Sequence, residues 1–453
     1  MNRGQGNEGP LGADTIPGMA TRRQLLASAV SGTAFAVSAF ALKGRATARR
    51  PVPELRPVAD QTTGAPLLRL PPGFSYKSVS WSLDATDDGN VVSGLHDGMG
   101  AFPAPDGRTV TLVRNHEITL APLLADRPVY DPTCGGGTTT LTFDAVAGDW
   151  LSSRVSLAGT YKNCSGGPTP WGSWLTCEET LADPSTHRVS RRHGFVFEVP
   201  ADGVGDPHPI PGLGRFKHEA AAVNPGTGIV YLTEDERRAG LYRFVPAGRA
   251  MGPEALRGPG QLQMLAIDGR ADPEDRPGSA APVAWVDIGD PEALDSRAVF
   301  DQGEALGGKA FRRLEGCWFD GGRLYFVATT GGSAGKGQVW ELGVADDRLT
   351  LLYESPGRET LDMPDNLVSL PGLGLLLCED GGSPTRLQLL TADGDIVTVA
   401  ENAVVLDGLR GFNGDYRGGE WCGACRAGDW LFVNLQLPGI TFAITGPWET
   451  LLG

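Results

Sequence analysis

The chain has 453 residues and a formal net charge of −15 at pH 7. This balance excludes a surface built to bind nucleic acid or anionic lipid, because both need clustered positive charge. The 64 glycines and 34 prolines require many turns, while a hydrophobic content of 41% argues against wholesale disorder. Short β-branched and aromatic segments between turn residues predominate, so we expect an all-β protein with many short strands.

The first 48 residues have the features of an export signal. Arg22 and Arg23 precede a mildly apolar segment from Leu25 to Leu42, and an Ala-Thr-Ala sequence at 46–48 fits a cleavage site. This combination resembles a twin-arginine signal peptide, which predicts the twin-arginine export machinery as a partner and a periplasmic or secreted location. A membrane anchor is the alternative, but the segment is short and only moderately apolar. We therefore expect no stable membrane insertion after cleavage.

A repeated unit organises the sequence that follows this signal. Each copy has an acid, a strand, a glycine-containing turn, a second strand that ends in a polar group, and a further strand. Clear copies begin near residues 218, 315, 364 and 420, and two weaker copies end at 117 and 179. About six copies at a spacing of about 40–60 residues are typical of four-stranded propeller blades. We therefore predict a single β-propeller domain over residues 49–453, with an insertion at about 252–310.

Acidic residues recur at the same places in these copies. In a propeller, equivalent positions of successive blades surround one axis, so these acids should converge. Many carboxylates at one place could not all stay ionised and unpaired, and metal cations would remove that conflict. Taken singly, each acid is equally well explained as a solvated strand end. The carboxylates that we predict as metal ligands are Glu117, Glu178, Glu179, Glu219, Asp235, Glu315, Asp365, Glu379 and Glu420.

The stretch from Asn163 to Glu179 combines this pattern with two thiols, Cys164 and Cys177. Carboxylate oxygens alone suit Ca²⁺ or Mg²⁺, whereas carboxylates with thiolate and imidazole suit iron or zinc. His116 and His218 each directly precede a recurring acid. We leave open whether these two histidines are ligands or acid–base groups, or whether they only orient a neighbouring ligand.

Two motifs with catalytic associations lack the structural context that they need. The cysteines at 422 and 425 have thioredoxin-like spacing, but a turn and a strand follow them where that motif requires a helix. A G-x-S-x-G pattern at 331–335 is followed by a strand-like segment, although a serine hydrolase elbow needs a helix there. We interpret the cysteine pair as a local disulfide or core packing, and the second motif as a hairpin loop.

Several motifs together resemble the PhoX-type alkaline phosphatase family. They are NCSGGPTPWGSWLTCEE at 163–179, GRFKHEAA at 214–221, YLTEDER at 231–237, ATTGGSAGKGQVWEL at 328–342 and FVNLQLPGITFAITGPW at 432–448. The resemblance extends from about Tyr76 to the end of the chain. It implies a six-bladed β-propeller with Fe³⁺ and Ca²⁺ at the central axis. It also implies hydrolysis of phosphate monoesters outside the cytoplasm, through metal-activated attack on phosphorus.

The same resemblance implies roles for individual residues. Cys164 would be the thiolate ligand of iron, with Cys177 as the second choice. Arg313 would hold the substrate phosphate, because a guanidinium matches its geometry. Together with His218 and Asn115, Arg313 forms our set of candidate catalytic residues. The carboxylate ligands implied by the family motif are Glu178, Glu179, Glu219 and Glu315.

The chain departs from the family pattern beside the candidate arginine. Familiar members read Arg-Pro-Glu-Trp, whereas leucine and glycine flank the glutamate of this chain at positions 314 and 316. Two other functions fit the residues taken by themselves. One is a calcium-dependent propeller lactonase, and the other is a calcium-stabilised propeller that binds a ligand without catalysis.

Overall fold

The computed structural model describes residues 54–452, except 121–128, 249–250, 270–275 and 296. The chain divides into two compact units, residues 1–38 and 39–453, and every described residue belongs to the second unit. The signal peptide predicted over residues 1–48 therefore lies outside the described residues. Within the described part of the chain, no helix has the length and apolar character needed to cross a membrane.

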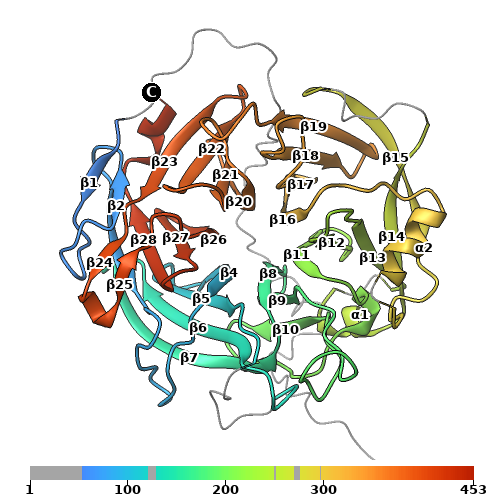
Figure 1. Ribbon diagram of the computed structural model, residues 1–453, viewed down its shortest axis with the longest axis horizontal. Coiled ribbons are helices and arrows are strands. Elements are labelled where there is room, and N and C mark those ends of the chain that lie inside the picture. The colour runs from blue at the N-terminus through green and yellow to red at the C-terminus, as the bar shows by residue number, and fades with distance from the viewer. Residues whose placement is uncertain (1–53, 121–128, 249–250, 270–275, 296, 453) are drawn as a thin grey trace, which may run out of the picture. The chain divides into compact units, whose positions relative to one another are not determined.

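A ring of inner strands surrounds the centre of the second unit (Figure 1). Each of these strands contacts the next one along the chain, and the last contacts the first, so the ring is closed. The inner strands are β4 (His96–Pro103), β8 (Asn163–Pro168), β11 (His218–Val223), β16 (Leu314–Asp320), β20 (Pro364–Leu370) and β26 (Trp421–Ala427).

Outside the ring, successive strands pair antiparallel, mostly in chain order. The second strands are β5 (Thr109–His116), β9 (Ser173–Glu178), β12 (Val230–Glu234), β17 (Arg323–Ala328), β21 (Gly374–Glu379) and β27 (Trp430–Leu435). The third strands are β6 (Gly136–Asp144), β10 (Val196–Pro200), β13 (Leu241–Pro246), β18 (Gln338–Gly343), β22 (Arg386–Thr391) and β28 (Ile440–Thr445). The outer strands are β7 (Asp149–Thr160), β14 (Gly260–Ile267), β19 (Arg348–Glu354), β23 (Ile396–Asn402) and β3 (Ser75–Val79).

The ends of the described chain meet in one sheet, because β3 pairs with β28. This pairing joins the earliest of these strands to the last one and completes a four-stranded sheet, β26-β27-β28-β3. The prediction of an all-β, propeller-like fold is confirmed. Two short strands, β1 (Arg56–Val58) and β2 (Leu68–Leu70), extend the sheet of β20 to β23, and β24 (Val405–Asp407) pairs with β25 (Asn413–Asp415).

The region predicted as an insertion, 252–310, is partly built into the sheets. Its strand β14 pairs with β13, so it completes the sheet of β11, β12 and β13. The next strand, β15 (Ala280–Asp287), pairs with both β14 and β19 and links two sheets into one of nine strands. The remainder includes two short helices, α1 (Pro253–Arg257) and α2 (Ala298–Ala305).

The sheets are buried on both faces, which explains their continuously apolar strands. In β21, Leu375 and Leu377 pack in one core cluster with Tyr325 of β17. Leu376, between them, packs in a different cluster that contains Val433 of β27. Because successive side chains of a strand point to opposite faces, β21 is covered by a neighbouring sheet on each side.

Each inner strand bulges near its first residue, where its register with the second strand shifts by one. A bulge bends the strand and redirects a side chain. In β26 the shift falls one residue later than in the other five, between Cys422 and Cys425. The residues at the first bulged position of the other five strands are Asp97, Cys164, Glu219, Glu315 and Asp365.

All seven cysteines are free thiols. Cys422 and Cys425 both lie on β26, and β27 follows after a turn, as expected, where a thioredoxin-like motif would need a helix. Cys425 packs in an apolar core cluster, and the local disulfide that we considered is not formed.

The second bulged position of β16 requires a small residue, which gives a test of the ring. A Cβ added to Gly316 would lie 2.8 Å from the Cα of Asn366 on the neighbouring inner strand. We expect Gly316→Ala to lower the free energy of unfolding by about 1–3 kcal/mol through overpacking. Gly226→Ala is the matched control, because its Cβ would meet only the Asn224 side chain at 3.4 Å. Equal denaturation midpoints for the two variants would contradict the close packing of the ring.

Candidate metal centre

One backbone hydrogen bond recurs around the ring and sets the positions of the central side chains. The residue after each second strand donates its N–H to the carbonyl of the residue before the inner strand, over 2.9–3.2 Å. This bond holds the end of each second strand beside the start of its inner strand. The side chains at both places therefore lie at the same end of the hairpin. The residues that donate it, which we call the rim positions, are Glu117, Glu179, Asp235, Thr329, Asp380 and Gln436.

The bulged and rim positions bring metal-ligating atoms together in overlapping groups of three. Within each group, one ligand atom from each residue lies within 4.8 Å of the others. The groups are Asp97, Glu420 and Cys422; Asp97, Glu117 and Cys164; Cys164, Glu179 and Glu219; and Glu219, Glu315 and Asp365. We call these nine residues the central cluster. Since Asp97, Cys164 and Glu219 are each shared between groups, the cluster is continuous.

Two carboxylate oxygens in the central cluster have no partner. Asp97 Oδ1 and Glu219 Oε2 are buried and make no hydrogen bond to a described residue. The other oxygen of Glu219 accepts only a long hydrogen bond, 3.4 Å, from Cys164 Sγ. Buried polar atoms are almost always paired, so unpaired carboxylate oxygens that face thiols and other acids fit a site for metal cations.

Crowding and burial change the protonation of the cluster. Burial, together with repulsion from Asp365 and Glu179, raises the pKa of Glu219 well above its usual range. Burial and the charge of Glu117 do the same to the pKa of Asp97, and burial raises the pKa of the Cys164 thiol. At the rim, burial raises the pKa of Asp380 to about 6. Without cations these groups therefore hold protons that a bound metal would displace.

Two positively charged side chains form ion pairs with carboxylates at the rim positions. Lys162 Nζ lies 3.0 Å from Glu117 Oε1 and 2.8 Å from Glu179 Oε2. Arg313 donates from Nε and Nη2 to both oxygens of Asp235, over 2.9 and 2.8 Å, and from Nη2 to Glu315 Oε1 over 2.8 Å.

Both cations keep donors that these bonds do not use. Arg313 Nη1 takes no part in them, and one N–H of the Lys162 ammonium is left over. Each side chain is 31% exposed. Arg313 has a φ of 53°, and Leu95, Lys162 and Met363 adopt the same left-handed conformation directly before their inner strands, so it belongs to the repeated turn of the fold.

Most of the predicted ligands meet at the centre. The predicted ligands that belong to the central cluster are Glu117, Cys164, Glu179, Glu219, Glu315, Asp365 and Glu420. Asp235 lies beside it, bound to Arg313. Cys177, the alternative thiolate, packs in an apolar core cluster with Leu175, so the geometry favours Cys164.

Glu178 and Glu379 are placed elsewhere and hold their own sheets together. Glu178 accepts hydrogen bonds from His193 Nδ1 at 2.7 Å and from the backbone N–H groups of residues 161, 194 and 195. Glu379 accepts two bonds from the guanidinium of Arg386, at 2.9 and 2.8 Å. Each precedes a rim residue, and successive residues of an extended chain point to opposite sides, so both acids of a pair cannot face the centre.

The three remaining candidates, Asn115, His116 and His218, hold neighbouring backbone or side-chain groups in place and contribute no atom to the central cluster. Asn115 donates to the carbonyls of Cys164 and Ser165 and accepts from the indole of Trp174, so its amide positions the bulge of β8. His218 Nε2 bonds to the Gly214 carbonyl, and burial lowers the pKa of this histidine to about 3. His116 bonds to the Gly94 carbonyl and the Thr139 hydroxyl. None of the three belongs to the central cluster.

The sequence prediction missed Asp97, Lys162 and Cys422. Asp97 and Cys422 both lie two residues after a residue that accepts the recurring hydrogen bond, as Cys164 and Glu219 do. Alignment of the copies on that residue, instead of on the acids, would have identified both.

Acids that anchor a sheet, such as Glu379, and acids of the central cluster, such as Glu219, should differ in how substitution by glutamine changes stability and metal content. In metal-free protein, Glu379→Gln breaks a buried ion pair and should lower the free energy of unfolding by about 3 kcal/mol. Glu219→Gln replaces a buried carboxyl that already holds a proton with a neutral amide of similar size, so it should leave that stability nearly unchanged. After metal loading, only Glu219→Gln should lower the calcium or iron content measured by elemental analysis. A loss of bound metal in Glu379→Gln with wild-type content in Glu219→Gln would refute the assignment.

Metal-free protein should lose stability as the pH rises. The central carboxyls have a higher pKa in the folded chain than in the unfolded chain, so the folded state holds more protons. Their contribution to the free energy of unfolding therefore falls as the pH rises above about 4, and for Asp380 it falls through about pH 6. We expect thermal melts of chelated protein to show a lower Tm at pH 8 than at pH 5. Added calcium should restore the Tm at pH 8. A chelated protein that is most stable at pH 8 would contradict the raised pKa values of the central carboxyls.

Comparison with known proteins shows the family of this chain. The family model for alkaline phosphatase PhoX matches residues 54–156 and 144–439. The structure is similar to that of Pseudomonas fluorescens PhoX in complex with vanadate, a transition-state analogue. The TM-score is 0.65 and the identity 18%, over 87% of this chain and 98% of that chain.

Two further structures are more distant. They are a virginiamycin B lyase from Staphylococcus aureus (TM-score 0.39, identity 11%, 82% of this chain and 99% of that chain) and a gluconolactonase from Xanthomonas campestris (0.40, 14%, 88% and 99%). The chain has no significant sequence match among curated proteins. The family model covers most of the chain, including every residue of the central cluster, and the chain therefore belongs to the PhoX alkaline phosphatase family.

Proposed function

We propose that the protein is an exported phosphatase that hydrolyses phosphate monoesters with the help of metal ions in the central cluster. The observation that carries this proposal is the continuous set of carboxylates and thiols at the centre of the ring, crossed by two cations with unused donors. Export rests on the twin-arginine pattern of residues 1–48 and predicts a periplasmic or secreted enzyme.

The strand order supports six blades. We interpret the nine-stranded sheet as two blades that are joined where β15 pairs with β19. The strands β1 and β2 are then additions to the blade of β20 to β23. Each of the six inner strands begins one blade, and the three-stranded sheet β8-β9-β10 is the smallest.

The donor types divide the central cluster into two kinds of metal site. Groups that contain Cys164 or Cys422 offer a thiolate with carboxylates, which suits iron. The group of Glu219, Glu315 and Asp365 offers oxygen only, which suits Ca²⁺. When bound, such ions would polarise phosphate oxygens and counter their charge.

Arg313 and Lys162 are the residues that we propose to hold the substrate phosphate. The carboxylates that bind them fix each side chain before substrate arrives, so little conformational entropy is lost on binding. The unused Nη1 donors of Arg313 and the third N–H of Lys162 can bond to phosphate oxygens. Because charge develops on those oxygens during transfer, the same donors would stabilise the transition state.

Further arginines lie close in the sequence to Arg313 and to its partner Asp235. Arg237, Arg238, Arg312 and Thr330 line a cavity of about 690 Å³. Arg312 directly precedes Arg313 in the sequence. Arg237 comes two residues after Asp235, which binds Arg313. On a chain with net charge −15, this local excess of positive charge would attract an anionic substrate to the mouth of the site.

Activity assays with metal analysis test the proposal. We expect the exported form to hydrolyse a phosphate monoester, to lose this activity on chelation, and to regain it with calcium and iron. Arg313→Lys keeps the charge but loses the guanidinium geometry, and it should lower kcat/KM about 10²-fold. Arg323→Lys is the control, because Arg323 lies on β17 of the same sheet and pairs with Glu341 away from the centre.

The same assays separate the alternatives. Lactone hydrolysis without monoesterase activity would select the lactonase. Bound calcium without activity on monoesters, diesters or lactones would select a binding propeller. Full monoesterase activity after chelation would refute metal assistance.

A further inference from the structure

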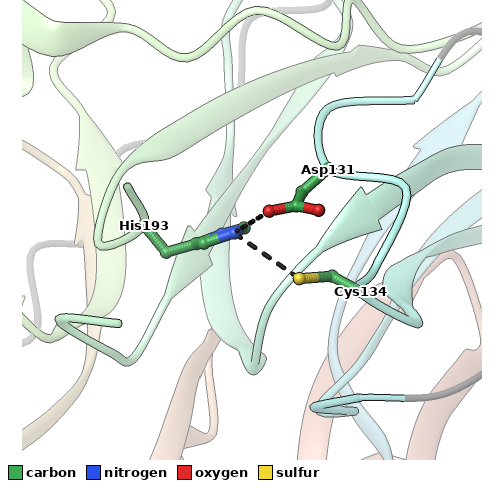
Figure 2. Close-up of side chains that lie close together, drawn as sticks. All are labelled: Asp131, Cys134 and His193. Atoms are coloured by element: carbon green, nitrogen blue, oxygen red, sulfur yellow. Dashed lines mark hydrogen bonds and ion pairs between the residues drawn. The ribbon is translucent and has the colours of Figure 1, made fainter. Parts of the chain in front are cut away.

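A second group of metal-ligating side chains lies outside the central cluster. It consists of Asp131, Cys134 and His193, which point toward one another in Figure 2. All three are fully buried, at 0% exposure. Asp131 and Cys134 come from the connection between β5 and β6, whereas His193 precedes β10. The group therefore joins segments that are about 60 residues apart in the sequence.

Two distances within this group match edges of a metal-centred tetrahedron. His193 Nε2 lies 3.5 Å from Cys134 Sγ and 3.4 Å from Asp131 Oδ2. Zinc bonds of about 2.0–2.1 Å to nitrogen or oxygen and about 2.3 Å to sulfur, at tetrahedral angles, place N and S about 3.6 Å apart and N and O about 3.4 Å apart. A hydrogen bond from Nε2 to Asp131 would instead be about 2.7–3.2 Å long.

The histidine ring is oriented as in many metal sites. His193 Nδ1 lies 2.7 Å from Glu178 Oε1, while the other oxygen of Glu178 accepts the N–H groups of Gly194 and Phe195. With its proton on Nδ1, the ring presents the lone pair of Nε2 to Asp131 and Cys134. A carboxylate behind a histidine ligand fixes its tautomer and raises its basicity.

Asp131 is held in place independently of any ion. Its Oδ1 accepts the N–H and hydroxyl of Thr133, and its Oδ2 accepts the N–H groups of Ser190 at 2.6 Å and Arg191 at 2.8 Å. These bonds fix the carboxylate so that Oδ2 faces His193. The ligand set is thus formed in advance, which lowers the entropy lost on metal binding.

The competing explanation is a buried imidazolium. Burial lowers the pKa of His193, but Glu178 and Cys134 raise it more strongly, to about 10. In that state both ring nitrogens carry protons, and no metal binds. The two explanations therefore differ in whether Nε2 carries a proton or a metal ion.

We propose that Asp131, Cys134 and His193 bind one zinc ion, separate from the metals of the central cluster. Sulfur, nitrogen and oxygen ligands in a small buried site suit zinc better than calcium. Binding releases the thiol proton of Cys134 and any proton on His193 Nε2 to solvent. The ion has a structural role: it ties the connection between β5 and β6 to the segment before β10. Through His193 and Glu178 it also supports the end of β9, next to Glu179 of the central cluster.

Metal content and stability of paired variants test this site. Elemental analysis of the mature protein, purified from zinc-containing medium without chelator, should give about one zinc per chain. Cys134→Ser should lose that zinc and lower the Tm, while iron, calcium and monoesterase kcat/KM stay within about twofold of wild type. Cys164→Ser, the matched thiol control at the centre, should lose iron and activity but retain the zinc.

A measurement on the wild-type protein removes the dependence on folding of the variant. Crystals of the same preparation should give an anomalous peak at the zinc edge between Asp131 Oδ2, Cys134 Sγ and His193 Nε2. No peak there, or an unchanged zinc content in Cys134→Ser, would overturn the proposal in favour of the imidazolium. Because neither readout uses phosphatase activity, failure of the zinc site and failure of the proposed function are distinguishable.

Discussion

The candidate metal centre depends on the close approach of carboxylates at one end of a closed ring of strands. A bulge at the start of each inner strand turns a ligand side chain toward its counterparts, and burial then raises the pKa values of those acids. Such an arrangement is unfavourable in an empty protein, because unpaired buried charge costs free energy. The fold tolerates it since both faces of the sheets are packed with apolar side chains, which stabilise the ring independently of its centre.

Two cations make part of this arrangement stable before any metal binds. Lys162 and Arg313 each bridge two acids and occupy equivalent places, directly before an inner strand. Their ion pairs leave donors unused at the mouth of the site, where a phosphate would arrive. Membership of the PhoX alkaline phosphatase family relates this arrangement to phosphate hydrolysis. The same groups that neutralise the rim are suited to recognise an anionic substrate.

Adjacent acids have different tasks because a strand alternates its side chains. Glu178 and Glu379 turn away from the centre and bind His193 and Arg386, whereas the next residue, Glu179 or Asp380, takes a rim position. The first acid of each pair thereby anchors the hairpin end that presents the second one. Substitution of the first acid should weaken its hairpin, whereas only the second acid could contact a metal.

The sequence by itself determined the all-β class and the repeat, and it predicted that Glu219, Glu315 and Asp365 converge, because strand length, turn residues and the repeat period can be read along the chain. The choice of Cys164 came from the family resemblance. The sequence could not separate Glu178 from Glu179, since the face of a strand that points inward depends on register and on a bulge that carries no fixed sequence signal. Asp97 was missed because its weak copy of the repeat was recognised only by the acid at its end, Glu117. Cys422 had looked like part of a redox motif or a core residue, and only the closure of the ring placed its thiol beside Asp97. Long-range pairing of strands decided these positions, because it sets which side chains share the axis.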